Sequence, residues 1–98
     1  MEQQKPQVKL ELSPEQSEGI YANGVAINHS PSEFILDFVR FLPGSQKAKV
    51  FARIIMTPQN VQLLRKAIDD NLKRYEERFG KIKIFEKEEK EIGFRPND

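Results

Sequence analysis

His29 is the only histidine in the chain, and side chains that a hydrolase could combine with it follow directly. A histidine base needs a nucleophile within hydrogen-bond reach and a third group that orients its ring. Ser30, Ser32 and Glu33 lie nearby in sequence, but residues so close along the chain seldom reach that geometry. Ser30 and Pro31 are also typical of a turn. We therefore expect a structural role for His29, with a small hydrolase as a distant alternative.

No group of residues has the spacing of a metal or cofactor site. The chain has no cysteine, and a single histidine cannot supply a zinc ligand set. The acidic residues near the C-terminus alternate with lysines that compete for them, and the five glycines form no phosphate-binding loop before a helix. We predict no catalytic residue, no metal, no cofactor and no small-molecule substrate.

Basic and aromatic residues are mixed between positions 40 and 53. Strand-based proteins that bind single-stranded nucleic acid combine cations for the phosphates with rings on which the bases stack. The residues concerned are Arg40, Lys47, Lys49 and Arg53, with Phe41 and Phe51. The formal net charge of +1 provides no overall attraction for nucleic acid. A nucleic-acid contact by Arg40, Lys47 and Lys49 is thus an alternative to solvated lysines beside core phenylalanines.

Composition limits the chain to one small domain, since 98 residues are 38% hydrophobic. No apolar run approaches the roughly 20 residues of a membrane-spanning helix, and the N-terminus has no export signal. The absence of cysteine removes any need for an oxidising compartment. We expect a cytoplasmic protein with no membrane contact.

Two long apolar strands, predicted over residues 33–42 and 47–56 and joined by the turn 43–46, form the centre of the predicted fold. Alternating apolar residues predict earlier strands over 8–12 and 20–29, the second with a bulge at Asn23 and Gly24. Residues 13–19 are assigned to a loop, although Ser13 and Pro14 could open a single helical turn. A short edge strand at 81–85 is a further possibility.

The pairing of these strands follows from their turns. If Ser30 pairs with Glu33, then Ile27 lies opposite Leu36, Val25 opposite Phe38 and Tyr21 opposite Leu42. If Leu42 pairs with Ala48 across the next turn, then Leu36 lies opposite Ile54, Phe34 opposite Met56 and Phe38 opposite Ala52. Asp37 then lies opposite Arg53. Each charge would be costly alone in an apolar strand, so this match supports the register.

A long helix is predicted over residues 58–79. Thr57 is a good N-cap, Pro58 suits the first helical position, and Gly80 can end the helix with a left-handed cap. Its apolar residues recur every three or four positions: Val61, Leu64, Ile68, Leu72, Tyr75 and Phe79. We predict an α+β domain over 8–85, a three- to four-stranded, mostly antiparallel meander with this helix packed on one face. Residues 1–7 are predicted to be a flexible lead and 86–98 a charged, mobile tail.

Three stretches, EGIYANGVAINHSPSEFILDFVRFLPG, RIIMTPQN and YEERFGKI, resemble a family of small bacterial and archaeal proteins, the domain of unknown function numbered 3467. The resemblance runs from about Leu10 to Ile82. It implies a short cytoplasmic protein with no assigned activity, and it transfers no catalytic residue.

One sheet face is left uncovered if the helix covers the face of Leu36, Phe38 and Ile54. Large exposed apolar patches usually mark interfaces. The predicted interface consists of Ile35, Val39, Phe41, Phe51 and Ile55 around Asp37 and Arg53. We therefore expect a non-enzymatic interaction module that forms a homo-oligomer, most simply a dimer, or docks on another protein. The alternative is an accessory factor of the transcription or nucleic-acid machinery that uses the basic-aromatic hairpin.

Overall fold

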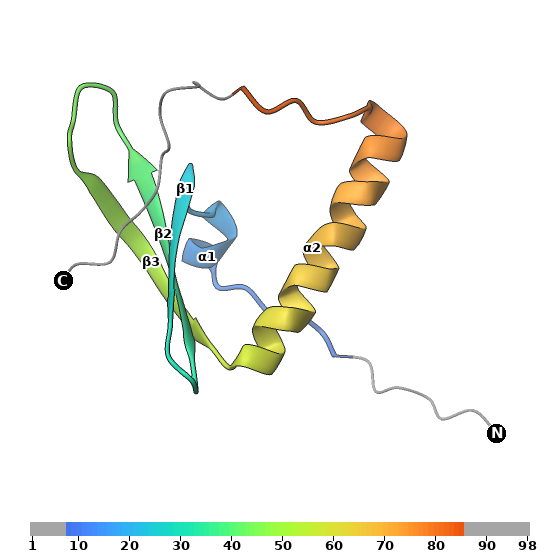
Figure 1. Cartoon of the computed structure of the whole chain (residues 1–98), viewed down its shortest axis with the longest axis horizontal. Helices are drawn as coiled ribbons and strands as arrows, with labels where there is room; N and C mark the ends of the chain where they lie inside the picture. Colours follow the sequence, from blue (N-terminus) through green and yellow to red (C-terminus); the bar gives the residue numbers. More distant parts are fainter. Residues whose placement is uncertain (1–7, 86–98) are drawn as a thin grey trace.

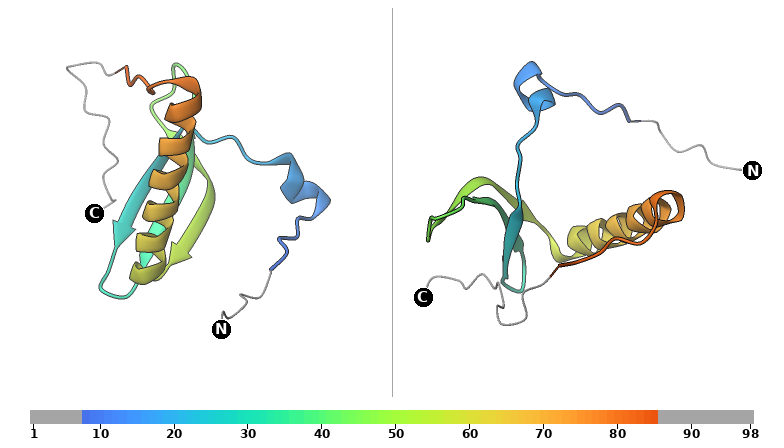
Figure 2. Two further views of the ribbon diagram at one scale, coloured as in Figure 1. Left: turned by 90° about the vertical axis from the view of Figure 1, so that its right-hand side faces the viewer. Right: turned by 90° about the horizontal axis from the view of Figure 1, so that it is seen from above.

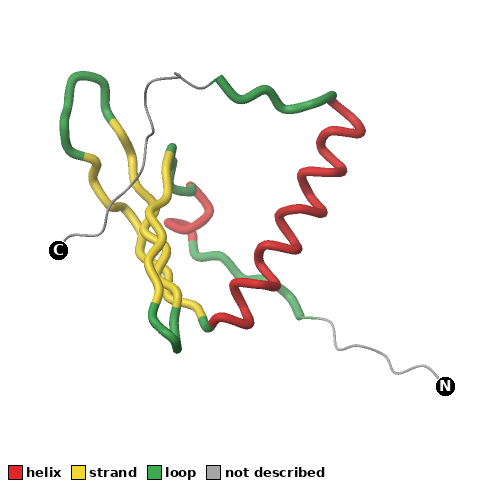
Figure 3. Tube along the Cα trace, in the orientation of Figure 1, coloured by secondary structure: helices red, strands yellow, loops and turns green. Residues whose placement is uncertain are grey.

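The computed structural model describes residues 8–85, so the predicted lead and tail lie outside the described residues. The elements in chain order are α1 (Pro14–Glu18), β1 (Gly24–His29), β2 (Phe34–Phe41), β3 (Ala48–Met56) and α2 (Pro58–Phe79) (Figures 1 and 3). The strands form one antiparallel sheet in the order β1-β2-β3. The predicted α+β class, the antiparallel meander and the long C-terminal helix are confirmed.

The predicted register is confirmed over most of the sheet. Ile27 lies opposite Leu36 in β1 and β2, and Asp37 lies opposite Arg53 in β2 and β3. The turn before β2 closes as expected, because the Ser30 amide donates to the Glu33 carbonyl at 2.9 Å. The central strand therefore has paired neighbours on both sides.

A β-bulge in β3 changes the register towards the β2–β3 turn. Phe38 lies opposite Ala52, but the next residue, Val39, lies opposite Val50, so Phe51 is an extra residue in β3. Phe41 consequently pairs with Ala48, and the predicted pairing of Leu42 with Ala48 is wrong. The bulge expected at Asn23 and Gly24 is also wrong.

The strand predicted over 20–29 is shorter, because β1 begins at Gly24. The Asn23 side chain takes over the role of strand backbone: its Oδ1 accepts from the Phe41 amide at 2.7 Å, and its Nδ2 donates to the Phe41 carbonyl at 3.2 Å. Tyr21 does not pair with Leu42. Its carbonyl accepts two hydrogen bonds from the Arg40 guanidinium, each 3.2 Å long.

The N-terminal segment forms a short helix where a loop was predicted. Ser13 and Gln16 make a reciprocal capping box, and Pro14 occupies the first turn, which together stabilise α1. Residues 8–12 and 81–85 are not strands. Alternating residues form a strand only when a neighbouring strand supplies backbone partners, and Figure 2 shows residues 8–12 running away from the sheet.

The predicted bounds of α2 are confirmed, from the Thr57 N-cap through Pro58 to Gly80. The Thr57 hydroxyl accepts from the Asn60 amide at 3.3 Å. Gly80 has φ 96° and ψ 172°, so φ is positive as expected, whereas ψ lies outside the left-handed helical region. Within the described residues, no helix is long and apolar enough to cross a membrane.

The predicted packing of α2 on the sheet is not observed. None of its side chains is buried, and Figures 1 and 2 show it leaving the end of β3 and diverging from the sheet. Among the described residues, the buried side chains are Leu36 and Val39 with Asp37. A single residue, Thr57, joins β3 to α2. That connection is shorter than usual between a strand and a helix, and it does not turn the helix back onto the sheet.

Candidate functional site

The central strand β2 gives the sheet two different faces, because alternate side chains point to opposite sides. We call them the Leu36 face and the Asp37 face. The Leu36 face carries Val25, Ile27, Phe34, Leu36, Phe38, Ala52, Ile54 and Met56, with Arg40 and Lys49 towards the β2–β3 turn. The Asp37 face carries Ile35, Asp37, Val39, Phe41, Ala48, Val50, Arg53 and Ile55. The first is apolar along most of its length, and the second has an ion pair at its centre.

Six of the seven predicted interface residues share the Asp37 face. Ile55 is 55% exposed and Phe41 is partly exposed, as an interface in the isolated chain requires. Val39 is only 3% exposed and belongs to the chain's own core. Phe51 lies on the opposite face, because the bulge reverses the alternation at this position. The prediction that Phe51 lies beside Phe41 and Ile55 is therefore wrong.

Asp37 and Arg53 form the polar centre of the Asp37 face. The Arg53 guanidinium donates hydrogen bonds from Nε and Nη2 to the two carboxylate oxygens of Asp37, at 2.7 and 2.9 Å. The carboxylate is buried, whereas Arg53 is exposed. These hydrogen bonds hold the pKa of Asp37 below its ordinary value, although burial opposes the shift. The same contact raises the pKa of Arg53. Asp37 is therefore an anion whose charge is already paired with that of Arg53.

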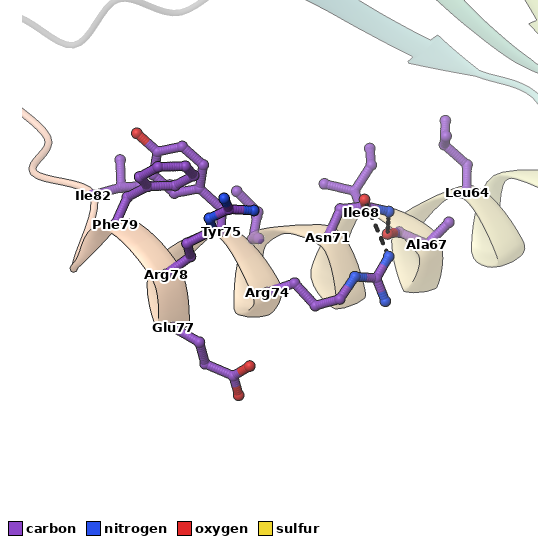
Figure 4. Close-up of a pocket in the computed structure, with 11 residues that line it drawn as sticks. Leu64, Ala67, Ile68, Asn71, Arg74, Tyr75, Glu77, Arg78, Phe79 and Ile82 are labelled. Carbon is purple, nitrogen blue, oxygen red and sulfur yellow. Dashed lines mark hydrogen bonds between the residues drawn. The ribbon is translucent and has the colours of Figure 1, made fainter.

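The apolar stripe of α2 forms a second uncovered surface, which sequence reasoning assigned to the core. Figure 4 shows Leu64, Ile68, Tyr75 and Phe79 projecting from one side of the helix, with Ile82 of the following segment beside Phe79, while Glu77 points away. A groove runs along this stripe, lined by Leu64, Ala67, Ile68, Asn71, Leu72, Arg74, Tyr75, Glu77, Arg78, Phe79 and Ile82. The 3.6-residue period revealed the stripe itself, but no sequence signal says what it packs against.

A basic-aromatic cluster occupies the end of the Leu36 face. The guanidinium carbon of Arg40 lies 4.2 Å from the centre of the Phe51 ring, and the Lys49 ammonium lies 5.3 Å from it. These are cation–π distances. Sequence reasoning placed Arg40 and Lys49 here but missed Tyr21, whose ring lies 5.8 Å from Arg40. Only the strand arrangement brings residues 19 positions apart together.

Lys47, the third predicted nucleic-acid residue, lies in the β2–β3 turn. Its amide donates to the Ser45 hydroxyl at 3.1 Å, which shapes the turn and leaves its side chain exposed. Lys47 is thus close in sequence to Lys49 but outside the contacts around Phe51. The cluster joins Arg40, Lys49, Phe51 and Tyr21.

His29 is the last residue of β1, next to the β1–β2 turn. Its ring stacks on Phe34 with centroids 5.3 Å apart. The Ser30 hydroxyl accepts hydrogen bonds from the amides of Ser32 and Glu33, both at 3.3 Å. The hydroxyl nearest in sequence to His29 is therefore used to close the β1–β2 turn. Across residues 8–85, no three metal-ligating side chains gather into a possible ion site.

Comparison with known proteins identifies the family of the chain. No curated protein and no solved structure matches it. The family described as "Protein of unknown function (DUF3467)" matches residues 1–84, which include the five helices and strands of the described part of the chain. The chain therefore belongs to the DUF3467 family of proteins of unknown function.

Proposed function

We propose that this protein is a non-enzymatic interaction module that self-associates and thereby covers apolar surface that a single chain leaves open. The observation that carries the proposal is the small core: Leu36 and Val39 are the buried apolar side chains of residues 8–85, and α2 buries none. Folding must offset the conformational entropy of every ordered residue, mainly by burying apolar surface. A second chain can supply the missing burial.

The Asp37 face suits such an interface. Ile35, Phe41 and Ile55 surround an ion pair that is already made within the chain, so a partner need not supply a countercharge for Asp37. A bidentate arginine–carboxylate pair can enter an interface without leaving an unpaired charge. Two copies of this face can meet across a two-fold axis, which makes a homodimer the simplest assembly. A different protein that docks on the same face is the other form of this proposal.

Light scattering at several protein concentrations tests self-association. Ile55→Asp puts a carboxylate on the Asp37 face at an exposed position, so it can disrupt the interface without disturbing the core. Gln62→Asp makes the same charge change on α2 and is the control. A dimer that Ile55→Asp converts into a folded monomer, while Gln62→Asp leaves it intact, supports self-association through the Asp37 face. A dimer that survives both substitutions supports self-association through another surface. A wild-type monomer at every concentration contradicts self-association and leaves docking on another protein, which a pull-down can examine.

A second candidate function is contact with single-stranded nucleic acid, which the cluster of Arg40, Lys49 and Phe51 favours. Cations beside a ring are the parts that such sites use. Arg40 is already held by the Tyr21 carbonyl, so Lys47 and Lys49, whose side chains are exposed, are the hairpin cations better placed to meet a phosphate. The protein would then be an accessory factor of the transcription or nucleic-acid machinery.

Fluorescence anisotropy with labelled single-stranded DNA and RNA tests this second candidate. Lys47→Glu combined with Lys49→Glu should weaken binding and reduce its salt dependence, because each lost phosphate contact lowers the salt slope by about one. Lys66→Glu combined with Lys73→Glu, on the polar side of α2, is the matched control. Equal affinity for the two double variants contradicts a specific role for the hairpin.

We propose the bacterial cytoplasm as the compartment. The chain has no cysteine, so no disulfide ties its fold to an oxidising environment. Cell fractionation with immunodetection tests this. Recovery of the protein in an exported fraction would contradict it.

A further inference from the structure

Two apolar surfaces of this chain match each other in chemistry and length, yet they do not meet within residues 8–85. The 22 residues of α2 reach about 33 Å at 1.5 Å per residue. The nine residues of β3 reach about 30 Å. The helix stripe and the Leu36 face are both apolar along most of these lengths. Each surface is of a kind and size that could cover the other.

The helix stripe becomes more exposed as α2 moves away from the sheet. Val61 and Leu64, next to the junction with β3, are half-buried. Ile68 is 48% exposed and Phe79, at the far end, is 66% exposed. Figures 1 and 2 show the corresponding wedge, which is narrow where α2 follows β3 and wide at the C-terminal end of α2. Residues 8–85 thus cover only the beginning of the helix stripe.

The junction at Thr57 resists closure of this wedge. Proline fixes its own φ near −65° and restricts the preceding residue to extended backbone. Thr57 has φ −73° and ψ 159°, as this restriction requires. Its carbonyl also accepts from the Val61 amide at 3.0 Å, and its hydroxyl accepts from the Asn60 amide. Rotation about this residue would break the helix cap, so another chain is better placed to cover the stripe.

The amount of exposed surface agrees with reciprocal packing of two copies. The residues concerned are Ile27 and Ile54 on the Leu36 face with Ile68, Leu72, Tyr75 and Phe79 on α2, all 43–66% exposed. A large side chain has roughly 200 Å² to bury, so covering these six removes about 600 Å². Two such contacts remove about 1,200 Å², the lower end for specific interfaces, whereas a single contact falls short.

We propose that α2 of one copy lies on the Leu36 face of a second copy, and that the second copy returns the same contact. This inference rests on the proposed self-association but assigns it to α2 and the Leu36 face instead of the Asp37 face, so it predicts that Ile55→Asp leaves the dimer intact. The Asp37 face then remains on the outside of the exchanged pair, where it can join further copies or another protein. The exchange resembles domain swapping across a short, stiff hinge, which favours the swapped over the closed form.

Chemical cross-linking between two differently tagged chains tests the exchange. The natural chain has no cysteine, so introduced thiols are the only reactive ones. One chain carries Leu72→Cys on the helix stripe, and the other carries Ile54→Cys on the Leu36 face. The chains are co-expressed and treated with a short bismaleimide, and mass spectrometry identifies the products. Lys73→Cys, on the polar side of α2, replaces Leu72→Cys in the control pair.

We expect a cross-linked product that contains both tags with Leu72→Cys, at a yield well above that of Lys73→Cys. A chain that carries both Leu72→Cys and Ile54→Cys and cross-links only within itself would overturn the inference. So would a dimer by light scattering that gives no product joining the two tags, although self-association would then stand. Monomers by light scattering would contradict the proposed self-association together with the inference.

A binding measurement gives an independent check. Leu72→Ala should raise the dimer Kd on the order of tenfold or more, as for a contact near the centre of an interface. Lys66→Ala, on the polar side of α2, should leave the Kd nearly unchanged. An equal Kd for Leu72→Ala and Lys66→Ala would contradict the exchange.

Discussion

The guanidinium of Arg53 donates two parallel hydrogen bonds to the carboxylate of Asp37, from Nε to Oδ1 at 2.7 Å and from Nη2 to Oδ2 at 2.9 Å. The two residues are directly opposed on β2 and β3. This contact gives the middle of an apolar strand a carboxylate that is both buried and satisfied. It also makes stability depend on pH in a defined direction.

The Asp37–Arg53 pair should stabilise the fold only above the acidic range. The folded-state pKa of Asp37 is lowered, so its contribution is fully present above the unfolded pKa near 4 and is lost as pH falls through the folded value. Arg53→Gln removes the partner and leaves the carboxylate buried. We expect the variant to be less stable than wild type in urea at pH 7, with a difference that shrinks below about pH 4. Arg65→Gln, an exposed arginine of α2, is the control. A pH-independent difference would show that Arg53 acts through packing alone.

Leu36 should contribute more to stability than an exposed leucine of the same chain. Leu36→Ala removes one of the two buried apolar side chains of residues 8–85 and should lower the free energy of unfolding by about 2–5 kcal/mol. Leu63→Ala, at an exposed position off the helix stripe, should change it by no more than about 0.5 kcal/mol. Urea unfolding at one fixed protein concentration measures both, because association shifts apparent stability. Equal losses of unfolding free energy in Leu36→Ala and Leu63→Ala would indicate that the sheet is not the stable part of the fold.

Arg40 and Phe51 should be energetically coupled through the bulge. A double-mutant cycle with Arg40→Met, Phe51→Leu and both together isolates the interaction between the guanidinium and the ring. We expect a coupling of about 0.5–1 kcal/mol, the range for a cation–π contact at an exposed site. The pair Lys66 and Tyr75, for which no contact is seen, is the reference cycle. Additive losses in the first cycle would mean that the stacking does not stabilise the fold.

Lengthening the β3–α2 junction should change the assembly. Insertion of Gly-Ser-Gly between Met56 and Thr57 keeps the Thr57 cap but lets the helix turn back, so α2 can close on its own sheet. We expect the insertion to shift the protein from dimer towards monomer in light scattering. Insertion of the same three residues in the turn between Gly44 and Ser45 is the control. An undiminished dimer would mean that the stiff junction does not direct the exchange.

The sequence was sufficient for the elements whose signals are local. The Thr57 cap, Pro58 and the 3.6-residue period defined α2 to the residue, because helix ends depend on backbone groups satisfied within a few positions. The register of β2 and β3 around Asp37 followed from the cost of an unpaired charge between apolar neighbours. The capping box of α1 is equally local, because Ser13 followed three residues later by Gln16 is a sequence signal for a helix start.

The sequence was not sufficient where distant segments decide the outcome. The extra residue at Phe51 reverses which face residues 48–50 occupy, and no residue type in β3 marks that position. The Asn23 side chain ends the ladder of β1 because Phe41 lies beside it, 18 positions along the chain. The alternation of Leu10 and Leu12 resembled a strand, but the chain places no neighbour there.

The sequence by itself therefore determined the family, the α+β class, the limits of α2 and the residues that make each surface apolar. Only the tertiary structure decided that the helix stripe stands apart from the sheet and that Phe51 joins Arg40 and Lys49. The physical reason is that periodicity states which side chains must avoid water, whereas the angle at a one-residue junction and a single bulge determine what they can pack against.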